Sequence, residues 1–270
     1  MMPSAHPATD RQRADRYDLY QRAVQNPDHE VQMLTRVYWD AFGREPLILR
    51  EDFCGTAAVC HAWVRSDPAR EAFGVDLDPA PLAWAWQHNN VLLNLPERGR
   101  LVLLQEDARS VGNTARADVL AAENYSFFVF RQRAELLDYF RAVHANLKDE
   151  GVLLMDVQGG PEVITGGHRH SRNLEDAVYE WEVAHFDALT HEATCRIHFR
   201  FPDGTALTPA FEYHWRMWSP PEIRELVAEA GFSRSLFYLG VESAEGGLEF
   251  QKANHAPVQP RVLAYLAAIK

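Results

Sequence analysis

The stretch from residue 47 to residue 79 constrains the fold more than any other part of this chain of 270 residues. A short apolar alternation leads into Arg50, Glu51 and Asp52, and a turn around Gly55 is followed by a helical run of small and apolar residues. A second apolar run, residues 72–75, ends at Asp76. This succession predicts a strand, a tight turn, a helix and a second strand, the opening unit of an α/β fold.

The two acidic groups of this stretch are expected to face one crevice. Ligands of open α/β sheets bind outside the carboxyl ends of the strands, where Glu51, Asp52 and Asp76 would lie. A carboxylate about 20 residues past a glycine turn is also the place at which a ribose diol is bound. The stretch therefore predicts a nucleotide-type ligand at this edge of the sheet.

The rest of the chain continues the strand and helix alternation. Strands are expected at 101–104, 117–122, 152–157, 232–239 and 261–269, with helices at 79–90, 132–147 and 220–230. Residues 246–260 are predicted to form a loop. The expected fold is a Rossmann-like sheet of seven mainly parallel strands, flanked by helices, with right-handed crossovers.

Two regions depart from this alternation. Residues 1–45 are predicted to form a polar tail, residues 1–9, and a helical cap with helices over 10–25 and 28–42. Residues 175–218 alternate with a period of two, which predicts an antiparallel insertion of three strands, preceded by a flexible segment over 159–173. Residues 46–270 are otherwise expected to form one domain that binds the ligand.

Composition excludes several classes of function. A net charge of −11 argues against a nucleic acid partner, which needs clustered basic residues. No apolar run approaches the length of a membrane span. The three cysteines, Cys54, Cys60 and Cys195, show no disulfide or metal-ligand pattern, so we expect a cytoplasmic protein. We expect no metal, although His168 and His170 could share a strand face. Whether the protein forms a homodimer stays open.

Two segments resemble a known family. REDFCGTA, residues 50–57, and GVDLDP, residues 74–79, resemble the first two motifs of the class I S-adenosylmethionine (SAM) dependent methyltransferases. The family opens with an acidic residue and G-x-G-x-G, which places Glu51 at the acid but Phe53 and Ala57 at the first and third glycines. Only Gly55 keeps the pattern.

The resemblance implies SAM as the cofactor and a set of residues around it. In the family, the first motif holds the methionine end, the acid after the second strand holds the ribose, and an acidic residue with a small neighbour reads the adenine. The implied cofactor-binding residues are Glu51, Asp52, Cys54, Gly55, Thr56, Ala57, Asp76, Leu77, Asp107, Ala108 and Glu123.

The resemblance also implies the reaction. Residues 123–126 follow the fourth strand, where small-molecule methyltransferases place the acceptor, so Asn124 and Tyr125 are expected to position it. The expected activity is methyl transfer from SAM to a nitrogen or oxygen of a small molecule, and whether a histidine acts as general base stays open. The alternatives are a non-catalytic SAM-binding protein and an NAD-binding oxidoreductase, which would need the glycines that this chain lacks.

Overall fold

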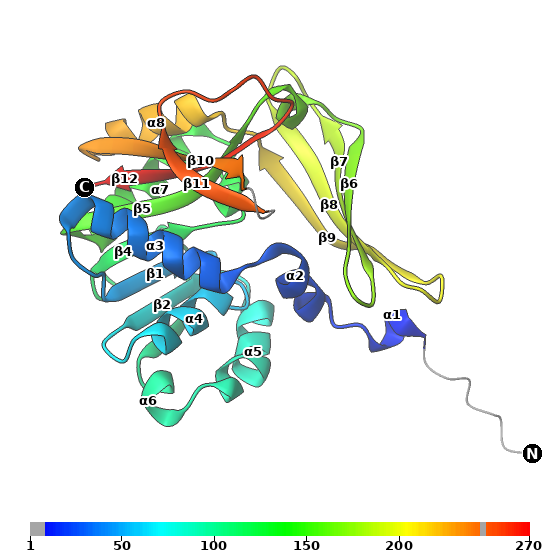
Figure 1. The fold of residues 1–270 in the computed structure, drawn as a ribbon, viewed down its shortest axis with the longest axis horizontal. Helices are drawn as coiled ribbons and strands as arrows, with labels where there is room; N and C mark the ends of the chain where they lie inside the picture. The colour runs from blue at the N-terminus through cyan, green and yellow to red at the C-terminus, as the bar shows by residue number, and fades with distance from the viewer. Residues whose placement is uncertain (1–8, 244–246) are drawn as a thin grey trace, which may run out of the picture.

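The main sheet has eight strands in the order β11-β10-β12-β5-β4-β1-β2-β3 (Figure 1). The computed structural model describes residues 9–243 and 247–270. The five parallel strands are β1 Ile48–Asp52, β2 Glu71–Asp76, β3 Leu101–Gln105, β4 Ala117–Ala122 and β5 Leu147–Gly159. Strands β10 Arg234–Glu242, β11 Leu248–Ala253 and β12 Val262–Ile269 are antiparallel to their neighbours. The predicted mainly parallel α/β sheet is confirmed.

Helices cover both faces of this sheet, because its central strands are apolar on both sides. In β4, Val119 packs toward helices α3 and α4, whereas Leu120 packs toward α7 and α8. One face carries α3 Pro27–Phe42, α4 Ala58–Ser66, α5 Pro79–His88, η1 Asn90–Leu92 and α6 Leu95–Arg98; the other carries η2 Ser126–Val129, α7 Arg133–Asn146 and α8 Pro220–Glu229.

The prediction of seven strands was wrong by one. Strand β11 lies inside residues 246–260, which were predicted to be a loop, and pairs antiparallel with β10. The strand forms the edge of the sheet, where only Phe250 and Ala253 are partly buried and the other four residues are exposed. Backbone pairing with β10 forms this strand, and the hydrophobic alternation used for prediction does not report backbone pairing.

A second sheet stands beside the first and contains four antiparallel strands, one more than predicted. They are β6 His168–Asn173, β7 Val178–Phe186, β8 Glu192–Arg200 and β9 Ala206–Arg216, after the short η3 Pro161–Ile164. Strand β6 lies in the segment predicted to be flexible, and its polar sequence reflects its place at an exposed edge. Val183, Cys195 and Trp215 of this sheet pack into the same core as α7 and α8.

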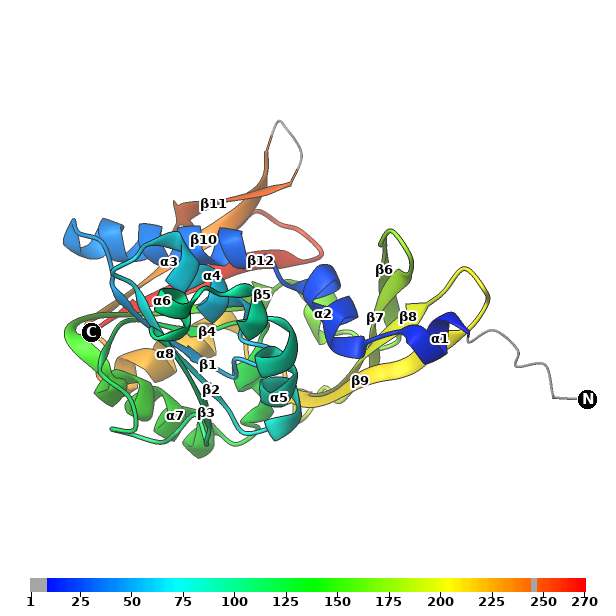
Figure 2. The same cartoon turned by 90° about the horizontal axis from the view of Figure 1, so that it is seen from below.

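The N-terminal segment joins the two sheets (Figure 2). Helix α2 Arg16–Val24 follows α1 Asp10–Arg13, and Leu19 and Ala23 pack against Ile197 and Phe199 of β8. The Trp84 Nε1 group of α5 donates to the Asp15 carboxylate at 2.5 Å. Residues 1–8 of the predicted tail lie outside the described residues. None of the described helices is long and apolar enough to cross a membrane.

Candidate functional site

A cleft of about 390 Å³ lies at the carboxyl ends of β1, β2 and β4, and we call it the strand-tip cleft. Helix α2 and strand β9 close its other side with Tyr17, Tyr20 and Tyr213. Its floor contains eight of the residues that the sequence singled out: Glu51, Asp52, Cys54, Gly55, Thr56, Asp76, Glu123 and Asn124. The parallel sheet therefore brings the predicted strand ends to one place.

The turn after β1 has the backbone of a glycine-rich turn although it holds one glycine. Phe53, Gly55 and Ala57 have φ of 58°, 53° and 55°, the left-handed region that glycine adopts most readily. Nothing lies within 4 Å of the place that a Cβ on Gly55 would occupy, so the backbone there faces open space. The cleft can therefore admit a ligand directly against this turn.

Carboxylates of the cleft are held by backbone N–H groups. The Glu51 carboxylate accepts from Cys60 N–H at 3.0 Å, and Asp76 accepts from Gly55 N–H at 2.7 Å. Burial raises the pKa of Glu51 to about 7, helped by the negative charge of Asp76, and burial also raises the pKa of Asp76. The cleft is therefore acidic and favours a ligand with positive charge and hydrogen-bond donors.

Asp52 is tied into the protein interior. Its carboxylate accepts from Arg50 Nε at 2.7 Å and from Tyr139 OH at 3.2 Å, and the Arg50 side chain is fully buried. Arg50 also donates to the Ala108 carbonyl at 3.1 Å. Burial raises the pKa of Asp52, and the adjacent Arg50 acts in the opposite direction. This buried ion pair fastens the end of β1.

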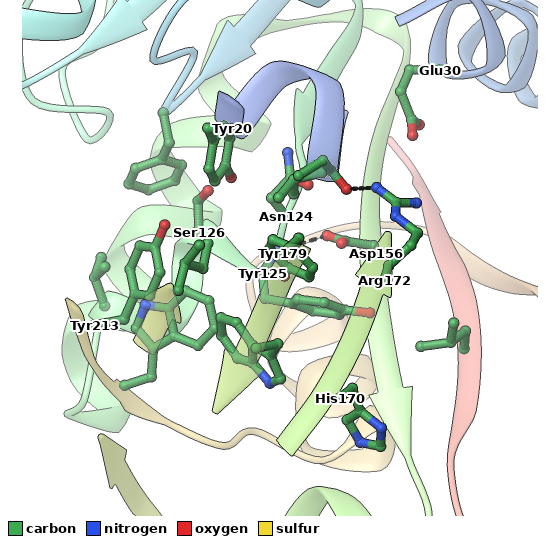
Figure 3. A pocket seen from close by; sticks show the side chains of 18 of the residues that line it. Tyr20, Glu30, Asn124, Tyr125, Ser126, Asp156, His170, Arg172, Tyr179 and Tyr213 are labelled. Carbon is green, nitrogen blue, oxygen red and sulfur yellow. Dashed lines mark hydrogen bonds between the residues drawn. The ribbon is translucent and has the colours of Figure 1, made fainter. Parts of the chain in front are cut away.

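A larger cavity of about 800 Å³ opens from the strand-tip cleft, and we call it the large cavity (Figure 3). The two share Tyr20, Phe53, Asp76, Asp78, Asn124, Ser126 and Tyr213, so they are continuous. Sheet β6–β9 forms one wall with Tyr179, Trp181 and Trp215, and the ends of β5 and β12 form another. Tyr125 lines this cavity, and its N–H donates to the Asp156 carboxylate at 3.0 Å.

Several solved methyltransferases are similar to this chain over nearly its whole length. CcbJ from Streptomyces caelestis is 17% identical with a TM-score of 0.67, over 94% of this chain and 96% of that one. CalS10 with SAM bound, an amino pentose methyltransferase from Micromonospora echinaspora, is 17% identical with a TM-score of 0.66, over 98% and 100%. The sugar N-methyltransferase KedS8 from Streptoalloteichus is 19% identical with a TM-score of 0.63, over 94% and 92%. The chain has the fold of SAM-dependent methyltransferases.

The resemblance seen in the sequence is therefore confirmed at the level of the fold. No protein-family model matches the sequence, and no curated protein matches it. At such low identity the matched structures establish the architecture, and the activity is argued below from the residues of this chain.

Four of the predicted cofactor residues line neither cavity. Leu77 is 68% exposed, and Ala57 is buried at the start of α4. The Asp107 carboxylate pairs with Arg109 at 2.6 Å, and this ion pair lowers the pKa of Asp107. Ala108 is buried with its carbonyl bound to Arg50. Their contact with a cofactor stays a prediction from the resemblance.

Three carboxylates of the large cavity were not predicted as site residues, and one of them, Asp78, caps α5 by accepting from Ala80 N–H at 2.9 Å. Asp156, near the end of β5, is partly exposed to the cavity, and burial among other acids raises its pKa to about 7. Glu30 of α3 accepts from Tyr265 OH at 2.9 and 2.7 Å. Asp156 could have been noticed in the sequence because it interrupts the apolar run of β5. Glu30 lies on a helix, and its sequence neighbours gave no such signal.

A cluster at the rim of the large cavity has the ligand types of a metal site. Glu162, His168 and His170 each offer one atom, and these atoms lie within 4.8 Å of one another. The His170 ring lies 2.5 Å from the Glu162 carboxylate, and His170 lines the cavity. The pair of histidines noted in the sequence therefore shares one strand face beside the cavity.

Proposed function

We propose that this protein is a SAM-dependent methyltransferase that moves a methyl group to a nitrogen or oxygen of a small molecule. The observation that carries the proposal is the pair of connected cavities on a methyltransferase fold. The strand-tip cleft would hold the donor, and the large cavity, with its aromatic wall, would hold the acceptor. Asn124 and Ser126, which line both, stand where the two would meet.

The residues of the cleft fit SAM. The open space above Gly55 admits its methionine end, and the Glu51 and Glu123 carboxylates suit its positive charges. Asp76, at the end of β2, suits the ribose diol, because its carboxylate offers two acceptor oxygens. One oxygen of Glu123 is buried with no donor in the described structure, which is consistent with a ligand as its partner.

The bound donor would supply a methyl group already activated by positive sulfur, so the protein mainly aligns the acceptor and excludes water. Tyr20, Phe53 and Tyr213 surround the passage between the cavities and shield it. Asn124 offers an amide for orienting the acceptor, and the Tyr125 ring forms part of the cavity wall. These are the positioning roles that we propose for both residues.

An NAD-binding oxidoreductase fits the cleft less well. A pyrophosphate carries negative charge, and Glu51, Asp76 and Glu123 would repel it. A non-catalytic SAM-binding protein would not need the large cavity beside Asn124. We further propose a cytoplasmic protein, because its three cysteines are buried free thiols, with no nucleic acid partner. A homodimer stays a prediction.

Calorimetry and thermal unfolding with SAM, S-adenosylhomocysteine and NAD test the donor. SAM and S-adenosylhomocysteine should bind, and at a concentration of 100 times the dissociation constant each should stabilise the protein by about 2.7 kcal/mol. Tight binding of NAD alone would overturn the proposal. Formation of S-adenosylhomocysteine with a panel of amines and alcohols then separates an enzyme from a protein that only binds SAM.

Asp76→Ala should weaken SAM binding by about 1–3 kcal/mol, because charge-assisted hydrogen bonds to the ribose are lost. Calorimetry measures this change. Asp138→Ala, an exposed acid on α7, is the control and should leave the affinity unaltered. Equal affinities for the Asp76→Ala variant and the parent protein would remove the ribose assignment while leaving the cleft itself in place.

A further inference from the structure

Four electrostatically coupled carboxylates line the strand-tip cleft or the large cavity, two in each. They come from four elements: Glu30 of α3, Glu51 of β1, Glu123 after β4 and Asp156 of β5. Negative charges of Glu30, Glu51 and Asp156 all act on Glu123, so the group is one electrostatic cluster. Across residues 9–243 and 247–270, no lysine or arginine pairs with any member, and His29 adjoins Glu30.

The cluster also contains an unsatisfied atom. Glu123 is 7% exposed, and its Oε1 atom finds no hydrogen-bond donor among the described residues. Glu123 lines the strand-tip cleft, so this buried atom belongs to a residue that borders a space large enough for a ligand. Burial and the neighbouring acids raise its pKa well above the ordinary range. An empty cluster of this kind is unfavourable, and a cation bound among the carboxylates would relieve it.

The positive charges of the proposed donor, SAM, would match only two of the four carboxylates. Glu51 and Glu123 line the strand-tip cleft, where the proposed SAM would bring its positive charges. Glu30 and Asp156 line only the large cavity, which the acceptor would fill. In Figure 3, Tyr20 and Tyr213 lie on one side of Asn124 and Asp156 on the other. A second positive charge, on the acceptor itself, would match Glu30 and Asp156.

Each arginine of the large cavity donates to a neutral oxygen of the protein, and the Arg261 Nε atom has no acceptor among the described residues. Arg172 donates to the Ala23 carbonyl, and Arg261 donates to the Gln158 amide oxygen at 3.0 Å. His170 pairs with Glu162 at the rim. Aromatic side chains complete the cavity, and the tilted rings of Trp181 and Trp215 have centroids 5.7 Å apart. Aromatic faces beside carboxylates form an environment that favours organic cations over neutral or anionic groups.

We infer, on the basis of the proposed function, that the acceptor is an amine that enters as its ammonium ion, held by Asp156 and Glu30, and that Asp156 takes its proton. The N–H bond breaks, and the proton moves to the Asp156 carboxylate. The nitrogen lone pair then forms the N–C bond to the methyl carbon, and the C–S electron pair stays on the sulfur of the sulfonium donor. The product is a methylated ammonium ion, and Asp156 returns the proton to water.

The geometry of Asp156 suits this role. Tyr125 N–H holds its Oδ1 atom at 3.0 Å, so the carboxylate is fixed while the side chain remains partly exposed to the cavity. A group with a pKa of about 7 is divided between its two protonation states at neutral pH, as a proton acceptor for an ammonium ion requires.

Matched pairs of ligands test this inference on the protein loaded with S-adenosylhomocysteine. The probes are glucosamine and glucose, tyramine and tyrosol, and cyclohexylamine and cyclohexanol, compared by calorimetry and thermal shift at pH 7.5. At least one amine should bind tenfold more tightly than its matched alcohol. If no amine does so, the inference is overturned, while binding of S-adenosylhomocysteine still supports the proposed function.

Asp156→Asn should remove this preference for the amine while SAM still binds, because Asp156 does not line the strand-tip cleft and acts on it only through its charge near Glu123. Glu30→Gln is the second variant and should weaken amine binding in the same direction. Asp149→Asn, an exposed acid, is the matched control. An amine preference that survives in both Asp156→Asn and Glu30→Gln would refute the assignment.

Discussion

Four residues other than glycine hold a left-handed backbone at the ends of β1 and β4. Phe53, Ala57, Asn124 and Tyr125 have φ between 55° and 58°, and three of them line a cavity of the candidate site. Such a conformation costs about 1–2 kcal/mol for each residue with a side chain. Strained backbone of this kind gathers at binding sites, where the surrounding structure enforces it. The residues with strained backbone therefore lie at the same strand ends at which the ligand is proposed to bind.

Gly55→Ala should lower the stability by about 1 kcal/mol and weaken SAM binding at least tenfold, because its methyl group would stand in the open space of the cleft. Gly43→Ala is a matched control, since Gly43 also has a positive φ and open space but caps α3 away from the cleft. Both variants should unfold at similarly reduced temperatures, and only Gly55→Ala should lose affinity in calorimetry. Equal affinities in the two variants would contradict this placement of the donor.

At the scale of residues, the sequence predicted acids at strand ends that precede a turn, and it missed Glu30 on a helix and Asp156, which follows the apolar run 152–155 inside β5. Glu51 and Asp76 end apolar runs, so their position at the cleft could be inferred from the pattern. Glu30 lies on the first turn of α3, and nothing in its neighbours in sequence distinguishes it from a solvated helix residue. Its place in the cavity results from the packing of α3 against the sheet, which is a tertiary contact.

At the scale of elements, one buried acid ties together α3, β1, β4 and β5. The Asp118 carboxylate accepts from Tyr38 OH at 3.2 Å and from the N–H groups of Leu47 and Ile48 at 3.0 and 2.8 Å. Lys148 donates to both of its oxygens at 2.9 Å. Burial acts to raise the pKa of Asp118, but the hydrogen bonds from Ile48 and Lys148 outweigh it, so the pKa lies below its ordinary value.

Asp118→Ala should therefore lower the free energy of unfolding by about 3 kcal/mol, since several donors lose their buried acceptor. Because the folded pKa is depressed, the stabilisation by Asp118 is present above the unfolded value of about 4 and is lost as the pH falls through the folded pKa. Urea unfolding between pH 7 and pH 3 should show a weaker pH dependence in this variant. Asp149→Asn, at an exposed site, should behave as the parent protein.

The strands of the sheet interior could be predicted, whereas two edge strands could not. Strand β4 is buried at every position, so its apolar run marks it clearly. Strands β6 and β11 are exposed at most positions; HRHSRN carries no apolar alternation, and LEFQKA carries it over four residues only. They form because β7 and β10 offer backbone partners, and these partners become apparent only when the chain is folded.

At the scale of the whole molecule, the main sheet and the second sheet share one hydrophobic core. Trp215 of β9 is 4% exposed and packs in the same hydrophobic cluster as buried residues of α7 and α8. It also lines the large cavity. Its ring meets Phe128 edge-on at a centroid distance of 5.9 Å. The wall of the large cavity is therefore continuous with the core and does not form a separate flap.

Trp215→Ala should cost about 3–5 kcal/mol of stability, because a large buried ring is removed, and Trp215→Phe should cost less. Neither variant should alter SAM affinity, since Trp215 does not line the strand-tip cleft. Chemical unfolding and calorimetry measure the two properties separately. Trp39→Ala, on the exposed face of α3, is the control and should remain near the parent stability. A large loss of SAM affinity in Trp215→Phe would show that the aromatic wall of the large cavity also supports the donor site.

The shared core has an evolutionary consequence. A descendant of this chain that acquires a differently shaped acceptor must alter side chains such as Trp181 and Trp215, and both contact the hydrophobic interior. A change of either tryptophan is therefore expected to perturb the packing of the interior as well as the shape of the large cavity. Substitutions at these two positions would change acceptor specificity and thermal stability together. A lineage that changes its acceptor through them would need compensating substitutions that stabilise the interior.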